Sequence, residues 1–172
     1  MFLVYGGDSE LSVKGYTDAS FQTDRDDLKS QSGYVFMMNG GAVCWKSSKQ
    51  TVIADSTTEA EYMAASEAAK EAVWIKQFLE GLRVVPTSKD PVPLFCDNSG
   101  AVFQAKEPKS SNKSRHVLRK FHVIRDYVDR KDISICKVGT EDNIADPLTK
   151  PLPQSKHDSH VVSMGIKRLP NM

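Results

Sequence analysis

The sequence predicts an α/β fold in which a five-stranded mixed sheet is flanked by helices. Two observations indicate this class. Short apolar or alternating runs come first, and longer segments rich in Ala, Glu and Lys then alternate with further apolar runs. The first three strands follow one another closely and are expected to be antiparallel, whereas the last two, separated by helices, are expected to run parallel. With 172 residues, the chain suits one domain with a single core.

Three strands are expected near the start of the chain. Residues 11–21 alternate in polarity, and 32–38 and 42–46 are apolar runs. Asn39-Gly40-Gly41 lies between the last two and predicts a tight turn, because Asn and Gly tolerate positive φ. Residues 45–50 are expected to form a loop that carries two lysines.

Helices are expected to alternate with strands in the rest of the chain. In the first of them, Ser56 to Glu59 has the pattern of a capping box and Gly81 is a typical stop. The expected helices span 56–81, 98–106, 115–131 and 142–150, and the expected strands span 92–96 and 133–138. Residues 154–172 are weakly patterned, so we expect a domain over 1–153 followed by a loose C-terminal tail.

Four acidic residues in distinct contexts indicate metal chemistry. Asp18 lies near the end of the first strand and Asp97 directly follows a buried one, while Glu61 and Asp146 belong to expected helices. A turn or cap role is the commoner explanation for a single Asp, but two matched strand-end aspartates are harder to explain in that way. Ligands gather at the carboxyl ends of strands in such sheets, and converging carboxylates bind the divalent cations that cut phosphodiesters.

Two glutamates compete for the helix position. Glu59 has a structural explanation as the reciprocal member of the capping box. Glu61 is followed by Tyr-Met-Ala-Ala, and a carboxylate on such an apolar helical surface costs free energy unless it is paired. We therefore favour Glu61 as the functional acid. Glu141 and Asp142 precede the last expected helix, and we expect them to cap it or to complement its dipole.

Basic residues gather in two places, although the net charge of +1 neither favours nor excludes nucleic acid. One group lies between Lys106 and Lys120 and is opposed only by Glu107, and the other contains Lys46 and Lys49. A solvated surface is the usual role of such charges. The alternative is a set of phosphate contacts that positions a nucleic acid.

The remaining composition limits other classes of function. The three cysteines form no C-x-x-C pair, so they are expected to be reduced residues of an intracellular protein without a zinc site. No apolar run approaches the roughly 20 residues that span a bilayer, and the first residues do not match a signal sequence. We therefore expect no membrane partner.

Taken in order, these segments resemble a ribonuclease H domain, in particular the kind carried by copia-type LTR retrotransposon polyproteins. No single segment is decisive, but together they cover nearly the whole chain. The segments are Gly15–Ser20, Ser32–Tyr34, Trp45–Gln50, Ser56–Tyr62, Cys96–Ala101, Arg115–His116, Phe121–Arg125 and Asn143–Lys150.

The resemblance implies a ribonuclease H-like fold with Asp18, Glu61, Asp97 and Asp146 as the catalytic and metal-binding set. In the family the helix acid precedes a hydrophobic pair and an alanine, which fits Glu61 and not Glu59. The implied activity is endonucleolytic hydrolysis of the RNA strand of RNA/DNA hybrids during reverse transcription. Two Mg²⁺ ions, which Mn²⁺ can replace, would serve it, with Asp18 expected to bridge them.

The resemblance also implies partners. The reverse transcriptase domain of the same polyprotein is one, and the chain is expected to be a monomeric segment of that polyprotein, acting in the cytoplasm within retrotransposon particles. Many family members carry a loop histidine before the last helix, and residues 138–142 have none. The expected contacts with the hybrid are Ser20, Lys49, Gln50, Asn98, Ser99, Lys113, Arg115 and His116.

Two other functions remain open at this point. An integrase-like nuclease or strand transferase would share the architecture and cleave DNA alone. A non-catalytic module of a reverse transcriptase would bind hybrids without cutting them, but such a module is expected to lose some of the four acids.

Overall fold

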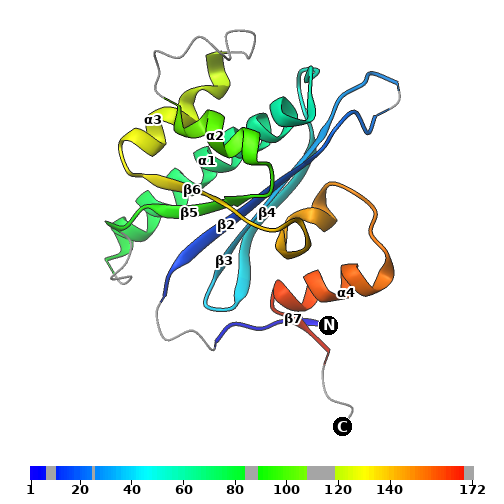
Figure 1. The fold of residues 1–172 in the computed structure, drawn as a ribbon. Helices are drawn as coiled ribbons and strands as arrows, with labels where there is room; N and C mark the ends of the chain where they lie inside the picture. Colours follow the sequence, from blue (N-terminus) through cyan, green and yellow to red (C-terminus); the bar gives the residue numbers. More distant parts are fainter. Residues whose placement is uncertain (7–10, 25, 84–88, 108–118, 169–172) are drawn as a thin grey trace.

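The main sheet has five strands in the order β4-β3-β2-β5-β6 (Figure 1). The computed structural model describes residues 1–6, 11–24, 26–83, 89–107 and 119–168. Strands β2, β3 and β4 pair antiparallel, β5 runs parallel to β2, and β6 runs parallel to β5. The mixed sheet predicted from the sequence is confirmed. Its strands are β2 (Val13–Ser20), β3 (Gln31–Met38), β4 (Gly41–Lys49), β5 (Val92–Cys96) and β6 (Ile133–Lys137).

The hairpin between β3 and β4 follows the Asn-Gly signal. Asn39 and Gly40 have φ values of 51° and 75°, as a tight hairpin turn requires. Strand β4 then continues to Lys49, which pairs with Gln31 of β3. The loop expected over residues 45–50 is therefore wrong for all but the last of them, because β3 supplies a long partner for the backbone of β4.

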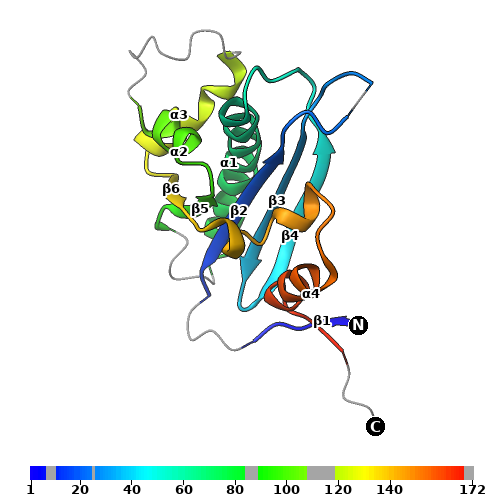
Figure 2. The same ribbon diagram turned by 45° about the vertical axis from the view of Figure 1, so that its right-hand side comes forward.

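Helix α1 (Thr57–Leu82) covers one face of the sheet (Figure 2). The hydroxyl of Ser56 accepts a hydrogen bond from the Glu59 amide, which confirms the predicted N-cap. Many of its buried residues are alanines, which form the core with Tyr62 and with apolar side chains of β2, β3, β5 and β6. The helix ends at Leu82 rather than at Gly81, because Arg83 takes the left-handed cap conformation with φ 57°.

The helical segments α2 (Ser99–Lys106), η2 (Arg119–Phe121) and α3 (Val123–Asp129) pack against α1. The single helix expected over 115–131 is wrong in its described part. The Ser66 hydroxyl donates to the Phe121 carbonyl, and the Arg125 amide bonds to the His122 carbonyl instead. The helix therefore breaks into two pieces because a side chain from α1 takes the acceptor that a continuous helix would use.

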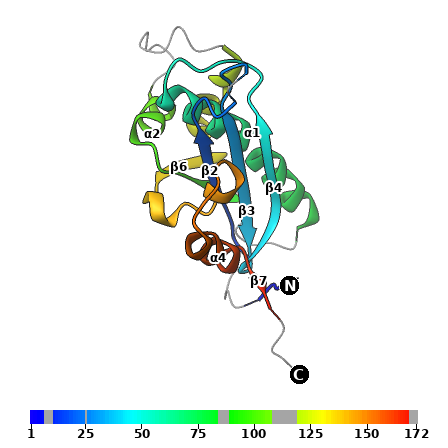
Figure 3. The same cartoon turned by 90° about the vertical axis from the view of Figure 1, so that its right-hand side faces the viewer.

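The opposite face of the sheet is covered by the C-terminal part of the chain (Figure 3). Residues 142–150 do not form the expected helix. They form part of two short 3₁₀ turns, η3 (Thr140–Asp142) and η4 (Asp146–Leu148). Pro147 explains the difference, because it has no N–H to donate within an α-helix.

The segment after Pro153 contains helix α4 (Gln154–Ser163) and strand β7 (Ile166–Lys167), which pairs with β1 (Phe2–Leu3). The expectation of a loose tail is wrong for these residues. Met164 is buried with Val35 and Ala145, and its carbonyl accepts the Ala42 amide at 3.0 Å. The apolar residues of the segment were too few to show a helical period in the sequence. The proposed domain boundary at residue 153 stays a prediction.

Gly33 allows η4 to lie close to the sheet, and this contact generates a prediction. A Cβ at Gly33 would lie 2.8 Å from Leu148 Cβ and 2.8 Å from Thr149 Cγ2. We expect Gly33→Ala to lower the free energy of unfolding by about 1–3 kcal/mol, because a well-packed contact must open. Chemical denaturation measures this change.

Gly81→Ala is the matched control, because a Cβ there meets nothing within 4 Å. It should leave stability unchanged or raise it by about 0.5–1 kcal/mol, as expected for Gly to Ala in a helix. Equal stability of both variants would contradict the close contact at Gly33.

Candidate active site

The pairing of two parallel strands brings Asp18 and Asp97 together. Thr17 of β2 is the register partner of Cys96 at the end of β5. The residue after each of these partners is an aspartate: Asp18 lies within β2, two residues before its end, and Asp97 directly follows β5, so the two carboxylates lie side by side near the carboxyl ends of the strands. Asp18 is fully buried, whereas Asp97 is half-buried.

Asp146 completes a group of three aspartates. Asp18, Asp97 and Asp146 each offer one carboxylate oxygen, and these oxygens lie within 4.8 Å of one another. Asn143 fixes the incoming segment: its side-chain amide donates to the Thr17 carbonyl at 3.1 Å and to Asp18 Oδ1 at 3.4 Å. The convergence predicted from the sequence is therefore present in the structure.

Glu61 joins the group from α1. One oxygen of Glu61 lies within 4.8 Å of ligand atoms of both Cys96 and Asp97. Its carboxylate accepts a hydrogen bond from the Ala19 amide. Glu59, by contrast, accepts the Asp55 amide at 3.0 Å and belongs to the N-terminal cap of the helix. Of the two competing glutamates, Glu61 is the one in the cluster.

Burial and mutual repulsion change the charge of this cluster. Burial raises the pKa of Asp18 to about 6; the Thr149 hydroxyl and the Lys150 ammonium oppose this shift, whereas Asp146 and Asp97 add to it. Burial, followed by the charges of Asp18 and Asp97, raises the pKa of Glu61 to about 9. Within the cluster, Glu61 therefore holds a proton near neutral pH.

The donor set fits a hard divalent cation. Asp18, Glu61, Asp97 and Asp146 present only carboxylate oxygens, which are the ligands that Mg²⁺ and Mn²⁺ take in proteins. Asp97 belongs to both groups of three, so the four acids form one continuous cluster. A bound cation would relieve the mutual repulsion, which adds to the effect of burial on the two pKa values.

Three polar residues predicted to contact nucleic acid lie beside the acids in the chain. Ser20 ends β2 two residues after Asp18, and Ser99 is exposed two residues after Asp97. Asn98 caps α2, because its Oδ1 accepts the Ala101 amide at 2.9 Å. These residues therefore flank the ends of the two strands that carry the aspartates.

Other predicted contacts have structural partners or lie outside the described residues. Gln50 is buried and donates to the Ser32 hydroxyl and the Ala60 carbonyl, both at 2.8 Å. The Lys49 ammonium pairs with Asp24 at 2.6 Å and with Asp27 at 3.2 Å. Lys113, Arg115 and His116 lie outside the part of the chain that the structure describes.

Three residues of the site were missed in the sequence. The Thr149 hydroxyl donates to Asp18 Oδ2, and the ammonium groups of Lys150 and Lys156 lie 2.9 Å and 3.1 Å from the two oxygens of Asp146. The i,i+4 spacing of Asp146 and Lys150 was a usable signal. Lys156 gave none, because its segment showed no pattern.

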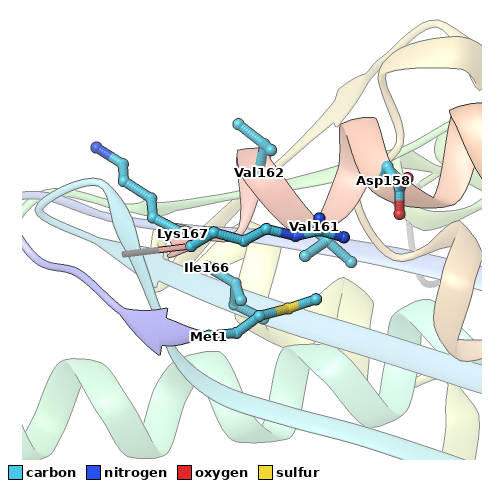
Figure 4. A pocket seen from close by; sticks show the side chains of 7 residues that line it. Met1, Asp158, Val161, Val162, Ile166 and Lys167 are labelled. Carbon is cyan, nitrogen blue, oxygen red and sulfur yellow. The ribbon is translucent and has the colours of Figure 1, made fainter. Parts of the chain in front are cut away.

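A pocket of about 450 Å³ lies elsewhere, between α4, β7 and Met1 (Figure 4). Its lining is largely apolar, with Val161, Val162 and Ile166, and it contains none of the four acids. The acid cluster is therefore separate from this pocket. Among the described residues, no helix is long and apolar enough to cross a bilayer.

Solved structures with the same fold are ribonucleases H. LC11-RNase H1, isolated from compost, aligns with a TM-score of 0.57 and 20% identity over 80% of this chain and 92% of that chain. RNase H1 from Halobacterium salinarum aligns with a TM-score of 0.52 and 20% identity over 86% and 98%. LC11-RNase H1 in complex with an RNA/DNA hybrid also aligns, with a TM-score of 0.57 and 19% identity over 80% and 94%. The fold of this chain is the ribonuclease H fold.

Sequence relatives include Pol polyproteins from transposons. The chain is 40% identical over 156 residues to the retrovirus-related Pol polyprotein from transposon TNT 1-94 of Nicotiana tabacum. It is 32% identical over 160 residues to that from transposon RE1 of Arabidopsis thaliana. These alignments cover 91% and 93% of this chain but 11% of each polyprotein, so the chain spans about a tenth of their length. No family model matches it. The resemblance to the ribonuclease H domain of a copia-type retrotransposon polyprotein is confirmed.

The raised pKa of Glu61 predicts how stability depends on pH without metal. The folded protein binds a proton here that the unfolded chain releases above pH of about 4.3, so stability falls as the pH rises from there to about 9. We expect Glu61→Gln to remove much of this fall and to raise the melting temperature at pH 8 by about 5 °C. Thermal unfolding in chelator from pH 5 to pH 8 measures it.

Glu80→Gln, at an exposed position of the same helix, should follow the wild-type pH dependence. If Glu61→Gln also followed the wild-type curve, the buried carboxyl would not be the group that binds the proton.

Proposed function

We propose that this chain is a metal-dependent endonuclease that hydrolyses the RNA strand of RNA/DNA hybrids. The observation that supports it most is the convergence of Asp18, Asp97 and Asp146, with Glu61 beside Asp97, at the carboxyl ends of β2 and β5. The ribonuclease H fold adds support, since one structure of that fold is a complex with an RNA/DNA hybrid.

The four acids would hold two Mg²⁺ ions, or Mn²⁺ in their place. Such ions supply an activated water and stabilise the leaving 3′ oxygen. Asp18 is our candidate for the ligand that both ions would share, and Glu61, Asp97 and Asp146 would supply the other carboxylate ligands. Asn143 and Thr149 would keep the Asp18 oxygens in place, because both donate to its carboxylate.

Recognition of the hybrid would depend on groups at the same strand ends. The 2′-hydroxyls of RNA distinguish it from DNA and are displayed in the wide minor groove. Ser20 and Ser99, with the amide of Asn98, are suited to such contacts because they flank the aspartates in the chain. Gln50 is a weaker candidate, since its amide already bonds to Ser32 and Ala60.

The DNA strand would lie along basic residues that position its phosphates. Lys113, Arg115 and His116 remain candidates from the sequence. Lys49 could contribute only by giving up its ion pairs with Asp24 and Asp27. Sequence preference is expected to be weak, because most of these contacts go to the backbone.

The relatives support a proposal about the partner and the location. Because the similar proteins are Pol polyproteins, we propose that the domain acts with the reverse transcriptase part of the same polyprotein, in the cytoplasm within retrotransposon particles. As an isolated domain it is expected to be a monomer.

Cleavage of a labelled RNA/DNA hybrid tests the function directly. With Mg²⁺ present, Asp18→Asn and Asp97→Asn should each lower the rate by about 100-fold or more, because the ions lose a ligand that the reaction needs. Glu61→Gln should be similarly inactive. Glu59→Gln should keep its activity, because that side chain belongs to the helix cap.

Double-stranded RNA and DNA of the same sequence are the substrate controls. Cleavage of DNA alone would favour an integrase-like nuclease. Hybrid binding without cleavage, together with no metal binding, would favour a non-catalytic module. Full activity in both aspartate variants would remove the mechanism.

A further inference from the structure

Two lysine ammonium groups lie at ion-pair distance from the carboxylate of Asp146, one near each oxygen. Lys150 Nζ lies 2.9 Å from Asp146 Oδ1 and 3.5 Å from Asp18 Oδ2, so it sits between two of the acids. Lys156 Nζ lies 3.1 Å from Asp146 Oδ2 and 3.3 Å from Glu141 Oε1. Asp146 itself is fully buried, so these ammonium groups compensate a charge that water does not reach.

Lys156 reaches the site because α4 is held firmly against the sheet. At the C-terminal end of the helix, Met164 is buried and bonds to Ala42. Gly165 follows with φ +81°, and a Cβ there would lie 2.6 Å from the Gly40 carbonyl oxygen. With that end fixed, the first turns of α4 lie over η4, where the Lys156 ammonium contacts Asp146.

An ammonium group and a divalent ion cannot bind one carboxylate oxygen in the same direction at full strength. Each oxygen of Asp146 has an ammonium neighbour, so a divalent ion that approaches either oxygen from the side of its ammonium competes with that contact. The free energy of any lysine contact that is lost must therefore be subtracted from the free energy of metal binding, because the two equilibria are linked.

We propose that Lys150 and Lys156 are resident counter-cations that hold Asp146 in the metal-free site and compete with the divalent ion for its oxygens. This inference rests on the proposed function, because it requires the cluster to bind divalent ions. Lys156 acts here as a positioning residue, and α4 thereby sets the metal affinity of the site from outside the motifs that carry the acids.

Calorimetric titration of the whole chain with Mn²⁺ tests the proposal. Lys150→Met and Lys156→Met should each tighten Mn²⁺ binding by about fivefold or more, the lower part of the usual range for coupled equilibria. The same variants should lose about 2–4 °C of melting temperature in chelator, because Asp146 loses a cationic partner. Lys156→Arg keeps the charge and should bind Mn²⁺ as the wild type does.

Lys137→Met is the matched control for charge alone. The Lys137 ammonium bonds to the backbone carbonyl of Asp97, so this variant removes one nearby positive charge without freeing an Asp146 oxygen. Its Mn²⁺ affinity should change less than that of Lys156→Met. Equal tightening in both variants, or unchanged or weaker binding in Lys150→Met and Lys156→Met, would overturn the proposal.

Mn²⁺ binding and hybrid cleavage by the wild type distinguish the proposed function from the proposed role of the lysines. If the wild type neither binds Mn²⁺ nor cleaves a hybrid, the proposed function is wrong. If the wild type does both while the two Lys→Met variants bind Mn²⁺ like the wild type, only the role of the lysines is wrong.

Discussion

The site depends on the register between the parallel strands β2 and β5. Thr17 and Cys96 are partners across this pair, and the residue after each is an aspartate. Successive side chains of a strand point to opposite faces of the sheet. A shift of the pairing by one residue would therefore turn one aspartate to the opposite face. The buried apolar side chains on these strands hold the register, and the register holds two carboxylates together against their mutual repulsion.

Bringing acids together in a buried place costs free energy, and the chain offsets this cost with specific neighbours. Thr149 and Asn143 donate to Asp18, the Ala19 amide donates to Glu61, and two lysines lie against Asp146. Even so, burial keeps the pKa values of Asp18 and Glu61 well above their usual range. A site under this strain is the kind of place where a divalent cation binds strongly, because it removes the repulsion at its source.

The irregular segment from η3 to η4 has a functional reason to be irregular. A regular helix would direct the Asn143 side chain by helical geometry alone. Asn143 instead lies between the two 3₁₀ turns in an extended conformation, and its side chain bonds to Thr17 and Asp18, which are more than a hundred residues away in the chain. The Ser66 hydroxyl acts comparably on the other side of the sheet. It donates to the Phe121 carbonyl, and the 3₁₀ turn η2 ends there before α3 begins. At Phe121 a tertiary hydrogen bond outweighs local helical preference, whereas near Asn143 the local effect of Pro147 and the tertiary hydrogen bonds act in the same direction.

The sequence by itself determined the order of the five main-sheet strands along the chain, the Asn39–Gly40 turn, and the N-terminal cap of α1 to which Glu59 belongs. These features depend on neighbours within a few residues, whose spacing is visible in the chain. Only the tertiary structure decided that Gln50 is buried, that Lys49 is paired, and that α4 brings Lys156 to Asp146. Those outcomes depend on which distant segments meet, and a polar residue's role follows from the partner it meets rather than from its type.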